Sequence, residues 1–276
     1  MGTPALPSPA RMVGVVMAAS AFLLGVFVGP HLVGPVGVQP VGNALTPAAA
    51  APPPPPPSAA ILSFPPSIRR LLINVGPNYD PLTPPDDDPA TGVLAVEAQL
   101  EVASELRERL ARAHPGRFFV IPAALAGEEH VGFRSFHMYN NGGVSSSLAE
   151  AAANHSWAAA GEGGRIGQGV EFVPVLTLGR LLGAVPPDVA IPLLKTDTQG
   201  FDLSVIQSAD RAALRRVDRL MVEVYENSTY YNLPDGVVND LSAWVPHMQR
   251  MGFALTSHPN WSGGEGDALF DRIGEP

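Results

Sequence analysis

The chain has 276 residues, a formal net charge of −9 and no cysteine. The lack of cysteine excludes disulfides, thiolate metal sites and cysteine nucleophiles, and an acidic chain without a basic stripe argues against nucleic acid as the main partner. Arg11 is the only charged residue before Arg69, whereas half of the 30 prolines lie in the first 68 residues. We therefore expect one folded domain after a non-globular N-terminal region.

The first apolar segment runs from Met12 to Val28 and carries no charge. As a helix it would span about 26 Å, which suits a thin endomembrane. We interpret residues 12–28 as a transmembrane signal anchor, with a cleaved signal peptide or a transit peptide as open alternatives. Because Arg11 precedes the span, residues 1–11 are predicted to be cytosolic and the remainder lumenal.

Residues 29–66 are rich in proline and include the unbroken run Pro52–Pro57. This composition is typical of a stiff stem, although a proline-rich ligand for another domain is an alternative. With a domain at 67–276, the layout predicts a single-pass type II membrane protein of the Golgi or endoplasmic reticulum. Lumenal exposure is mildly supported by N-x-S/T sequons at Asn154, Asn227 and Asn260, of which we expect Asn227 to stay unmodified.

Short apolar runs alternate with helical patterns in the rest of the chain. Strands are predicted at 71–75, 93–96, 118–121, 191–194, 220–224 and 252–255, and helices at 98–113 and 237–251. This alternation predicts an α/β fold with a mostly parallel sheet covered on both faces. Ligands bind beyond the carboxyl ends of such strands, so the residues that follow each apolar run are the candidates for a site.

Glu97 closes the second predicted strand, 22 residues after Val75. A carboxylate at about this distance after the first strand can accept two hydrogen bonds from an adenosine ribose. The alternative is that Glu97 caps the helix that follows, because acidic side chains favour helix N-termini.

The turn after the first strand, residues 74–80, contains a single glycine, Gly76. A nucleotide site favours glycine there, so that the backbone can approach the ligand. Pro77 has a fixed φ and no N–H to donate, so an ordinary strand-to-loop turn remains an alternative.

Lys195 and Asp197 follow the fourth apolar run and lie two residues apart, so on a strand they point to the same side. Charges at the end of a buried run are costly to desolvate unless they are paired or used. They are therefore either functional groups or a structural ion pair.

Three segments together resemble the FkbM-type methyltransferases, which use S-adenosylmethionine (SAM). INVGPNYD, VLAVE and LLKTDTQGFD stand in the order of the family's I-D-x-G-A-N-x-G motif, its strand-ending acid and its L-K-x-D-x-E-G-x-E block. Residues 123–127, 141–147 and 173–182 resemble further family segments, so the resemblance covers about residues 70–258.

The resemblance implies a Rossmann-like class I methyltransferase fold with a seven-stranded sheet, SAM as cofactor and O-methylation of a hydroxyl on a glycan or small molecule. Lys195 and Asp197 would be catalytic and would orient the cofactor or the acceptor. Cofactor-binding roles would fall to Asn74, Gly76, Asn78, Glu97 and Ala124.

The chain also departs from the family's motifs. Asn74 replaces an acid, Tyr79–Pro81 replace the second glycine region, and Gln199 and Asp202 replace glutamates. A non-catalytic binding domain that kept the fold is therefore one alternative. A lumenal glycosyltransferase that binds metal through Asp86 and Asp88 is another, although these residues lie between prolines and read as a solvated loop. No metal site is predicted, and Ser145–Ser147 are expected to form a loop rather than a nucleophile.

Overall fold

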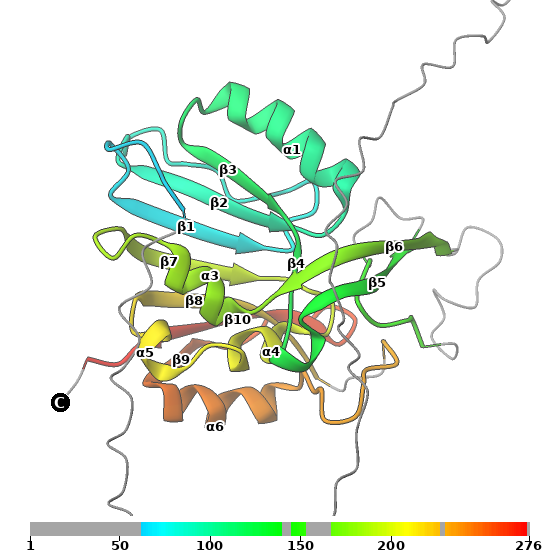
Figure 1. Ribbon diagram of the computed structural model, residues 1–276. Coiled ribbons are helices and arrows are strands. Elements are labelled where there is room, and N and C mark those ends of the chain that lie inside the picture. Colours follow the sequence, from blue (N-terminus) through cyan, green and yellow to red (C-terminus); the bar gives the residue numbers. More distant parts are fainter. Residues whose placement is uncertain (1–61, 140–144, 153–166, 227–229, 275–276) are drawn as a thin grey trace, which may run out of the picture. The chain divides into compact units, whose positions relative to one another are not determined.

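The computed structural model describes residues 62–139, 145–152, 167–226 and 230–274 (Figure 1). The predicted anchor at 12–28, nearly all of the predicted stem and two of the sequons, Asn154 and Asn227, lie outside the described residues. Within the described ranges, no helix is both long and apolar enough to cross a bilayer. Asn260 is described and exposed.

Seven strands form the main sheet in the order β3-β2-β1-β7-β8-β10-β9. The bounds are β1 Arg70–Val75, β2 Thr91–Glu97, β3 Phe118–Pro122, β7 Ala190–Thr196, β8 Val217–Tyr225, β9 Phe253–Ser257 and β10 Glu265–Arg272. The first five pair in parallel, and β10 is antiparallel to both neighbours. The predicted mostly parallel, seven-stranded sheet is confirmed, and its strands read as apolar runs because both faces are covered.

Helices cover both faces of this sheet. On one face α1 (Leu100–Ala113) packs Leu106 against Val93 and Ala95 of β2. On the other face α3 (Leu178–Ala184) and α4 (Asp202–Gln207) share a core with Leu71 and Ile73 of β1. The other helices among the described residues are η1 (Glu128–His130), α5 (Arg211–Leu214) and α6 (Leu241–Met251).

Helix α6 contains Pro246, as the sequence predicted, but it begins at Leu241 rather than at residue 237. Asp240 takes the N-cap position with an extended backbone, at ψ 140°. The helix ends at Gly252, whose φ of 90° suits glycine.

A second, three-stranded sheet was not predicted from the sequence. It consists of β4 (Ala124–Leu125), β6 (Gly167–Leu176) and β5 (Gly132–Tyr139), in that order. Phe136 and Val173 on its inner side are buried in one cluster with Phe201 and Tyr225. In Figure 1 this small sheet lies beside the carboxyl ends of β1, β2 and β3, so it forms a wall at the edge where ligands are expected.

The folded unit also reaches further toward the N-terminus than the predicted boundary at residue 67. The Leu62 N–H donates to the Ala184 carbonyl at 3.0 Å. The Phe64 ring lies 4.9 Å from the Phe119 ring in an edge-to-face contact. Residues 62–66 therefore belong to the domain and not to the stem, because their side chains pack on the core.

Candidate active site

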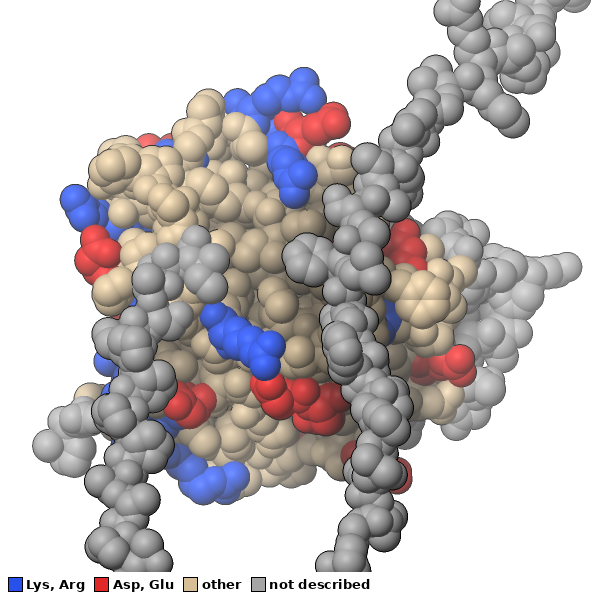
Figure 2. All heavy atoms as spheres, viewed as in Figure 1, with Lys and Arg blue, Asp and Glu red and all other residues tan. Residues whose placement is uncertain are grey.

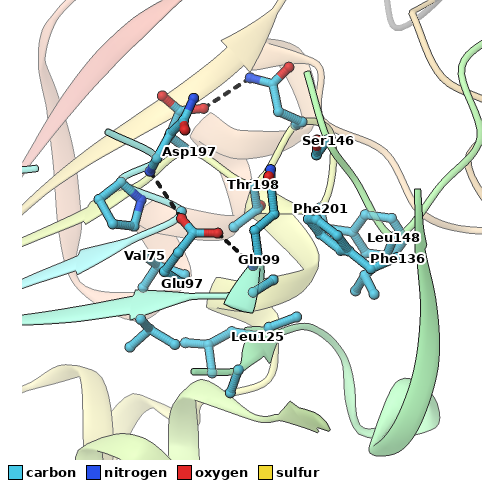
Figure 3. Close-up of a pocket in the computed structure, with 18 of the residues that line it drawn as sticks. Val75, Glu97, Gln99, Leu125, Phe136, Ser146, Leu148, Asp197, Thr198 and Phe201 are labelled. Atoms are coloured by element: carbon cyan, nitrogen blue, oxygen red, sulfur yellow. Dashed lines mark hydrogen bonds between the residues drawn. The ribbon is translucent and has the colours of Figure 1, made fainter. Parts of the chain in front are cut away.

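A pocket of about 370 Å³ opens at the carboxyl edge of the main sheet (Figure 3). It lies between the segments that follow β1, β2 and β7, at the point where the strand order reverses, and its volume suits a small molecule. The predicted site residues that line it are Gly76, Asn78, Glu97, Ala124, Lys195 and Asp197. Six of the seven residues named from the sequence thus line one pocket, and Asn74 does not.

Gly76 is required by a close approach between two strand ends. Its φ is +67°, and a Cβ added to it would lie 1.9 Å from the Asp197 carbonyl oxygen. The Asp197 N–H donates to the Val75 carbonyl at 3.0 Å, so the turn after β1 and the end of β7 are held against each other. Asn78 follows with a φ of 48°, which is uncommon outside glycine. Gly76 and Asn78, the residues of this turn with a positive φ, both line the pocket.

The Glu97 carboxylate is only 4 % exposed and lies in the pocket wall. Its Oε1 accepts from the Gln99 N–H at 2.8 Å and its Oε2 from the Asn78 N–H at 3.0 Å. Burial raises the pKa of Glu97, and these two hydrogen bonds oppose that effect. Since a carboxylate oxygen has two lone pairs, each oxygen can also accept from a ligand. Both of these N–H groups precede Leu100, the first residue of α1, so Glu97 ties the two loops together instead of capping the helix, and its oxygens remain compatible with ribose binding.

Asn74 does not line the pocket. Strand alternation puts it on the same face as Leu72, which packs in the α1 cluster. Its Oδ1 accepts from the Leu82 N–H at 2.8 Å, and its Nδ2 has no hydrogen-bond partner within the described residues. The structure therefore uses Asn74 to hold the loop after β1, in place of the predicted cofactor contact.

Lys195 and Asp197 lie on one wall of the pocket as a loose ion pair. Nζ and Oδ2 are 3.9 Å apart, and the side chains are 22 % and 32 % exposed. Burial raises the pKa of Asp197, against the lowering effects of a hydrogen bond from Gln199 and of the Lys195 charge. An ion pair with this separation and exposure contributes little to stability, so the structural interpretation of the pair is the weaker one.

A network of side chains behind Asp197 was missed by the sequence analysis. Gln199 Nε2 donates to Asp197 Oδ1 at 3.0 Å and to Glu223 at 3.1 Å. Tyr231 donates its hydroxyl to Gln199 Oε1 at 2.7 Å. Only tertiary structure joins these groups, because Glu223 belongs to β8 and Tyr231 to a loop that follows it.

Asp202 extends this network and is fully buried. Its Oδ1 accepts from the Thr198 N–H at 3.0 Å. Burial, with a further contribution from the nearby Asp197 charge, raises the pKa of Asp202 to about 7. The family-like block from Lys195 to Asp202 thus supplies a partly exposed carboxylate in the pocket and a buried one behind it.

The apolar end of the pocket also came only from the structure. Figure 3 shows Phe136, Leu148 and Phe201 grouped away from the carboxylates of Glu97 and Asp197. Ser146 lines the pocket as well, and its Oγ accepts from the Tyr139 N–H at 3.3 Å. The Ser147 hydroxyl donates to the Gln199 carbonyl at 2.9 Å. Both serines thus make the hydrogen bonds of an ordered loop.

The aspartate-rich loop lies at the opposite, amino edge of the sheet. Asp88 accepts hydrogen bonds from Arg70, Thr91 and the Ala90 N–H. Arg70 opens β1 and Thr91 opens β2, so this loop is remote from the pocket. Within the described ranges, no group of three or more metal-ligating side chains could hold a metal ion.

The sequence matches the family model described as the methyltransferase FkbM domain over residues 79–255. The match begins just after the turn at Gly76, where the chain departs from the family's first motif. The comparison with curated proteins found no match.

Three solved structures illustrate the similarity. A magnesium protoporphyrin IX methyltransferase from Synechocystis PCC 6803 is 8 % identical, with 75 % of this chain and 71 % of that chain covered and a TM-score of 0.38. A glycopeptide N-methyltransferase is 11 % identical, with 75 % and 90 % covered and a TM-score of 0.35. An rRNA methylase from Streptococcus thermophilus is 10 % identical, with 75 % and 90 % covered and a TM-score of 0.34. These likenesses are too distant to carry an argument about the substrate.

The family match spans more than half of the chain and contains the pocket residues from Tyr79 to Phe201. The chain belongs to the FkbM methyltransferase family, with the class I fold and the SAM cofactor that the sequence predicted.

Proposed function

We propose that this methyltransferase transfers a methyl group from SAM to a hydroxyl of a glycan or another small molecule. The observation that carries the proposal is the placement of Asp197 and Lys195 in the same pocket as Glu97. A hydroxyl acceptor has to lose its proton, and a carboxylate in the wall of the pocket can take it up.

The residues present fit SAM. Gly76 lets the turn after β1, which lines the pocket, lie tightly against the end of β7, because any side chain there would meet the Asp197 carbonyl. Glu97 is the buried carboxylate that would accept hydrogen bonds from the ribose, and Ala124 lines the pocket without filling it. The apolar group of Phe136, Leu148 and Phe201 offers a surface for the less polar parts of the ligands.

Bound SAM supplies a methyl group on a positively charged sulfur, an electrophile that needs no further activation. The task of the protein is therefore to align the acceptor oxygen and to remove its proton. Asp197 would take up this proton as the new carbon–oxygen bond forms. Lys195, 3.9 Å from Asp197, would hold the acceptor oxygen through its N–H donors.

The test combines calorimetry with transfer of a radiolabelled methyl group. We expect SAM to bind to a protein that begins at Leu62, and label to pass to sugars or phenols that carry free hydroxyls. Methylation of amines with hydroxyls left unmodified would contradict the hydroxyl proposal. SAM binding without transfer to any acceptor would favour the non-catalytic alternative.

The glycosyltransferase alternative gains no support from the site. Its predicted metal ligands, Asp86 and Asp88, lie at the amino edge, and Asp88 is engaged by Arg70. Titration with nucleotide sugars and manganese tests it directly, and we expect no heat of binding.

We further propose that the enzyme acts in an endomembrane lumen as a single-pass type II protein. The apolar segment 12–28, the proline-rich stem and the exposed sequon at Asn260 support this location. Expression of the full chain in a eukaryotic cell should give a membrane-bound protein that resists carbonate extraction. Its electrophoretic mobility should change on glycosidase treatment, and this change should be lost in Asn260→Gln if that sequon alone is used.

A further inference from the structure

We propose that Gln199 is a positioning residue, held by Glu223 and Tyr231, that fixes the Asp197 carboxylate in the wall of the pocket. This inference rests on the proposed function, since it concerns the group that would take up the proton of the acceptor. It adds three residues that the sequence analysis did not assign to catalysis.

The contacts around Gln199 favour one orientation of its amide, with the Tyr231 hydroxyl lying 3.0 Å from the Ser145 carbonyl as well as near the Gln199 oxygen. Its two N–H groups have two acceptors, Asp197 Oδ1 at 3.0 Å and the Glu223 carboxylate at 3.1 Å. Its oxygen faces the Tyr231 hydroxyl at 2.7 Å. In this orientation both N–H groups of the amide face carboxyl oxygens, and the hydrogen bond to Asp197 Oδ1 holds that oxygen in the pocket wall. The other oxygen of this carboxylate, Asp197 Oδ2, lies 3.9 Å from Lys195 Nζ.

The backbone of Gln199 is strained in a way that serves this contact. Its φ is 54°, and within the described ranges the only other non-glycine residue with a positive φ is Asn78, which also lines the pocket. A left-handed conformation at such a residue costs free energy and persists where surrounding contacts enforce it. Here the Ser147 hydroxyl donates to the Gln199 carbonyl at 2.9 Å, and Gly200 follows with a φ of 103°.

Electrostatics explains why an amide suits this place. Burial raises the pKa of Glu223 well above its usual range, and the charges of Asp197, Asp202 and Glu265 add to that effect. The Tyr225 hydroxyl, which donates to Glu223 at 3.3 Å, acts in the opposite direction. A neutral amide between Asp197 and Glu223 adds no charge to this acidic group, whereas a carboxylate at the same position would add one next to Asp197. Gln199 stands where the family motif has glutamate, so this arrangement belongs to the present chain.

The experiment uses two variants and a matched control. Gln199→Glu keeps the shape and replaces the N–H donors with a carboxylate, and Gln199→Met removes the polar contacts. Gln207→Glu, at the exposed end of α4, makes the same change of charge outside the site. The first measurement is an NMR titration of the carbon-13-labelled Asp197 carboxyl in the protein without ligand, assigned by its loss in Asp197→Asn. The second is kcat, and KM for SAM, with whichever hydroxyl acceptor the wild type methylates.

We expect Gln199→Glu to raise the pKa of Asp197 by about one unit or more, and Gln199→Met to raise it less. Gln207→Glu should leave it unchanged. For both Gln199 variants kcat should fall about tenfold or more, while KM for SAM stays within about threefold. For Gln199→Glu the acidic limb of the kcat profile should move to higher pH. Tyr231→Phe should lower kcat in the same way but by less.

An unchanged pKa of Asp197 in both Gln199 variants would overturn the inference. A lower melting temperature of these variants, with kcat at the wild-type value while the protein is folded, would also overturn it. A wild type that methylates no hydroxyl acceptor would count against the proposed function instead. The titration decides the positioning role in that case too, because it requires neither SAM nor an acceptor.

Discussion

The two pocket carboxylates are held in different ways. Glu97 accepts hydrogen bonds from two main-chain N–H groups, those of Asn78 and Gln99. Asp197 is held by side chains, with the Gln199 amide on one oxygen and Lys195 near the other. Main-chain donors exist whatever residues occupy their positions, whereas the contacts of Asp197 require particular side chains. The cofactor side of the pocket is thus set by the fold, and the opposite side is set by residue choice.

The surface shows no comparable division. On the face in Figure 2, basic and acidic side chains are interspersed, and among the described residues in view they form no continuous basic patch. The asymmetry described above is a property of the pocket. Four substitutions test whether the cofactor side of the pocket, at Glu97, and the opposite side, at Asp197, can be disturbed independently.

Gly76→Ala should have the largest effect, because the turn after β1 contacts both sides. The added methyl would meet the Asp197 carbonyl, and φ is unfavourable for alanine. We expect the free energy of unfolding to fall by about 3 kcal/mol or more, and SAM affinity to fall at least about tenfold. Chemical denaturation and calorimetry measure the two effects. Gly183→Ala is the control, since open space surrounds Gly183 in α3 and alanine favours helix there.

The pH dependence of stability should follow Asp202. Its folded pKa of about 7 lies above its unfolded value, so its contribution is full at acidic pH and is lost as the pH rises through 7. The domain should be less stable at pH 8 than at pH 5, by on the order of 3 kcal/mol from this group. In Asp202→Asn this dependence should flatten, while the exposed control Asp235→Asn keeps it. A wild-type stability that rises from pH 5 to pH 8 would contradict the buried protonated carboxyl.

Asp197→Asn should lower the rate of methyl transfer while leaving the stability of the domain nearly unchanged. Because the ion pair with Lys195 is loose and partly exposed, unfolding free energy should change by less than about 1 kcal/mol. Methyl transfer should fall by about 10²-fold or more, since the proton acceptor is lost. One purified variant provides both quantities. A strongly destabilised protein with near-normal turnover would remove Asp197 from the reaction.

Glu97→Gln should have the smallest effect of the four and should act mainly on the cofactor. The amide keeps one oxygen for the main-chain donors but loses the charge that favours ribose hydroxyls. We expect SAM affinity to fall by about 1–3 kcal/mol, with about 1 kcal/mol lost in stability. The exposed control Glu108→Gln on α1 should leave affinity unchanged. If stability falls sharply and affinity holds, the main role of Glu97 is to hold the two loops through the Asn78 and Gln99 N–H groups.

The sequence by itself determined six of the seven strands of the main sheet, because their apolar runs are local and uninterrupted, whereas β10 was not predicted. It also placed Glu97, Lys195 and Asp197 at the pocket, since the ends of parallel strands meet at one edge of the sheet. It misplaced Asn74, whose side chain points to the α1 face, and it ended the stem too late, because residues 62–66 pack on a core formed by distant segments. The second sheet and the Gln199–Glu223–Tyr231 network were decided only by tertiary structure. Glu223 and Tyr231 come from segments remote from Gln199, and their hydrogen bonds depend on an approach between β7 and β8 that no local pattern records.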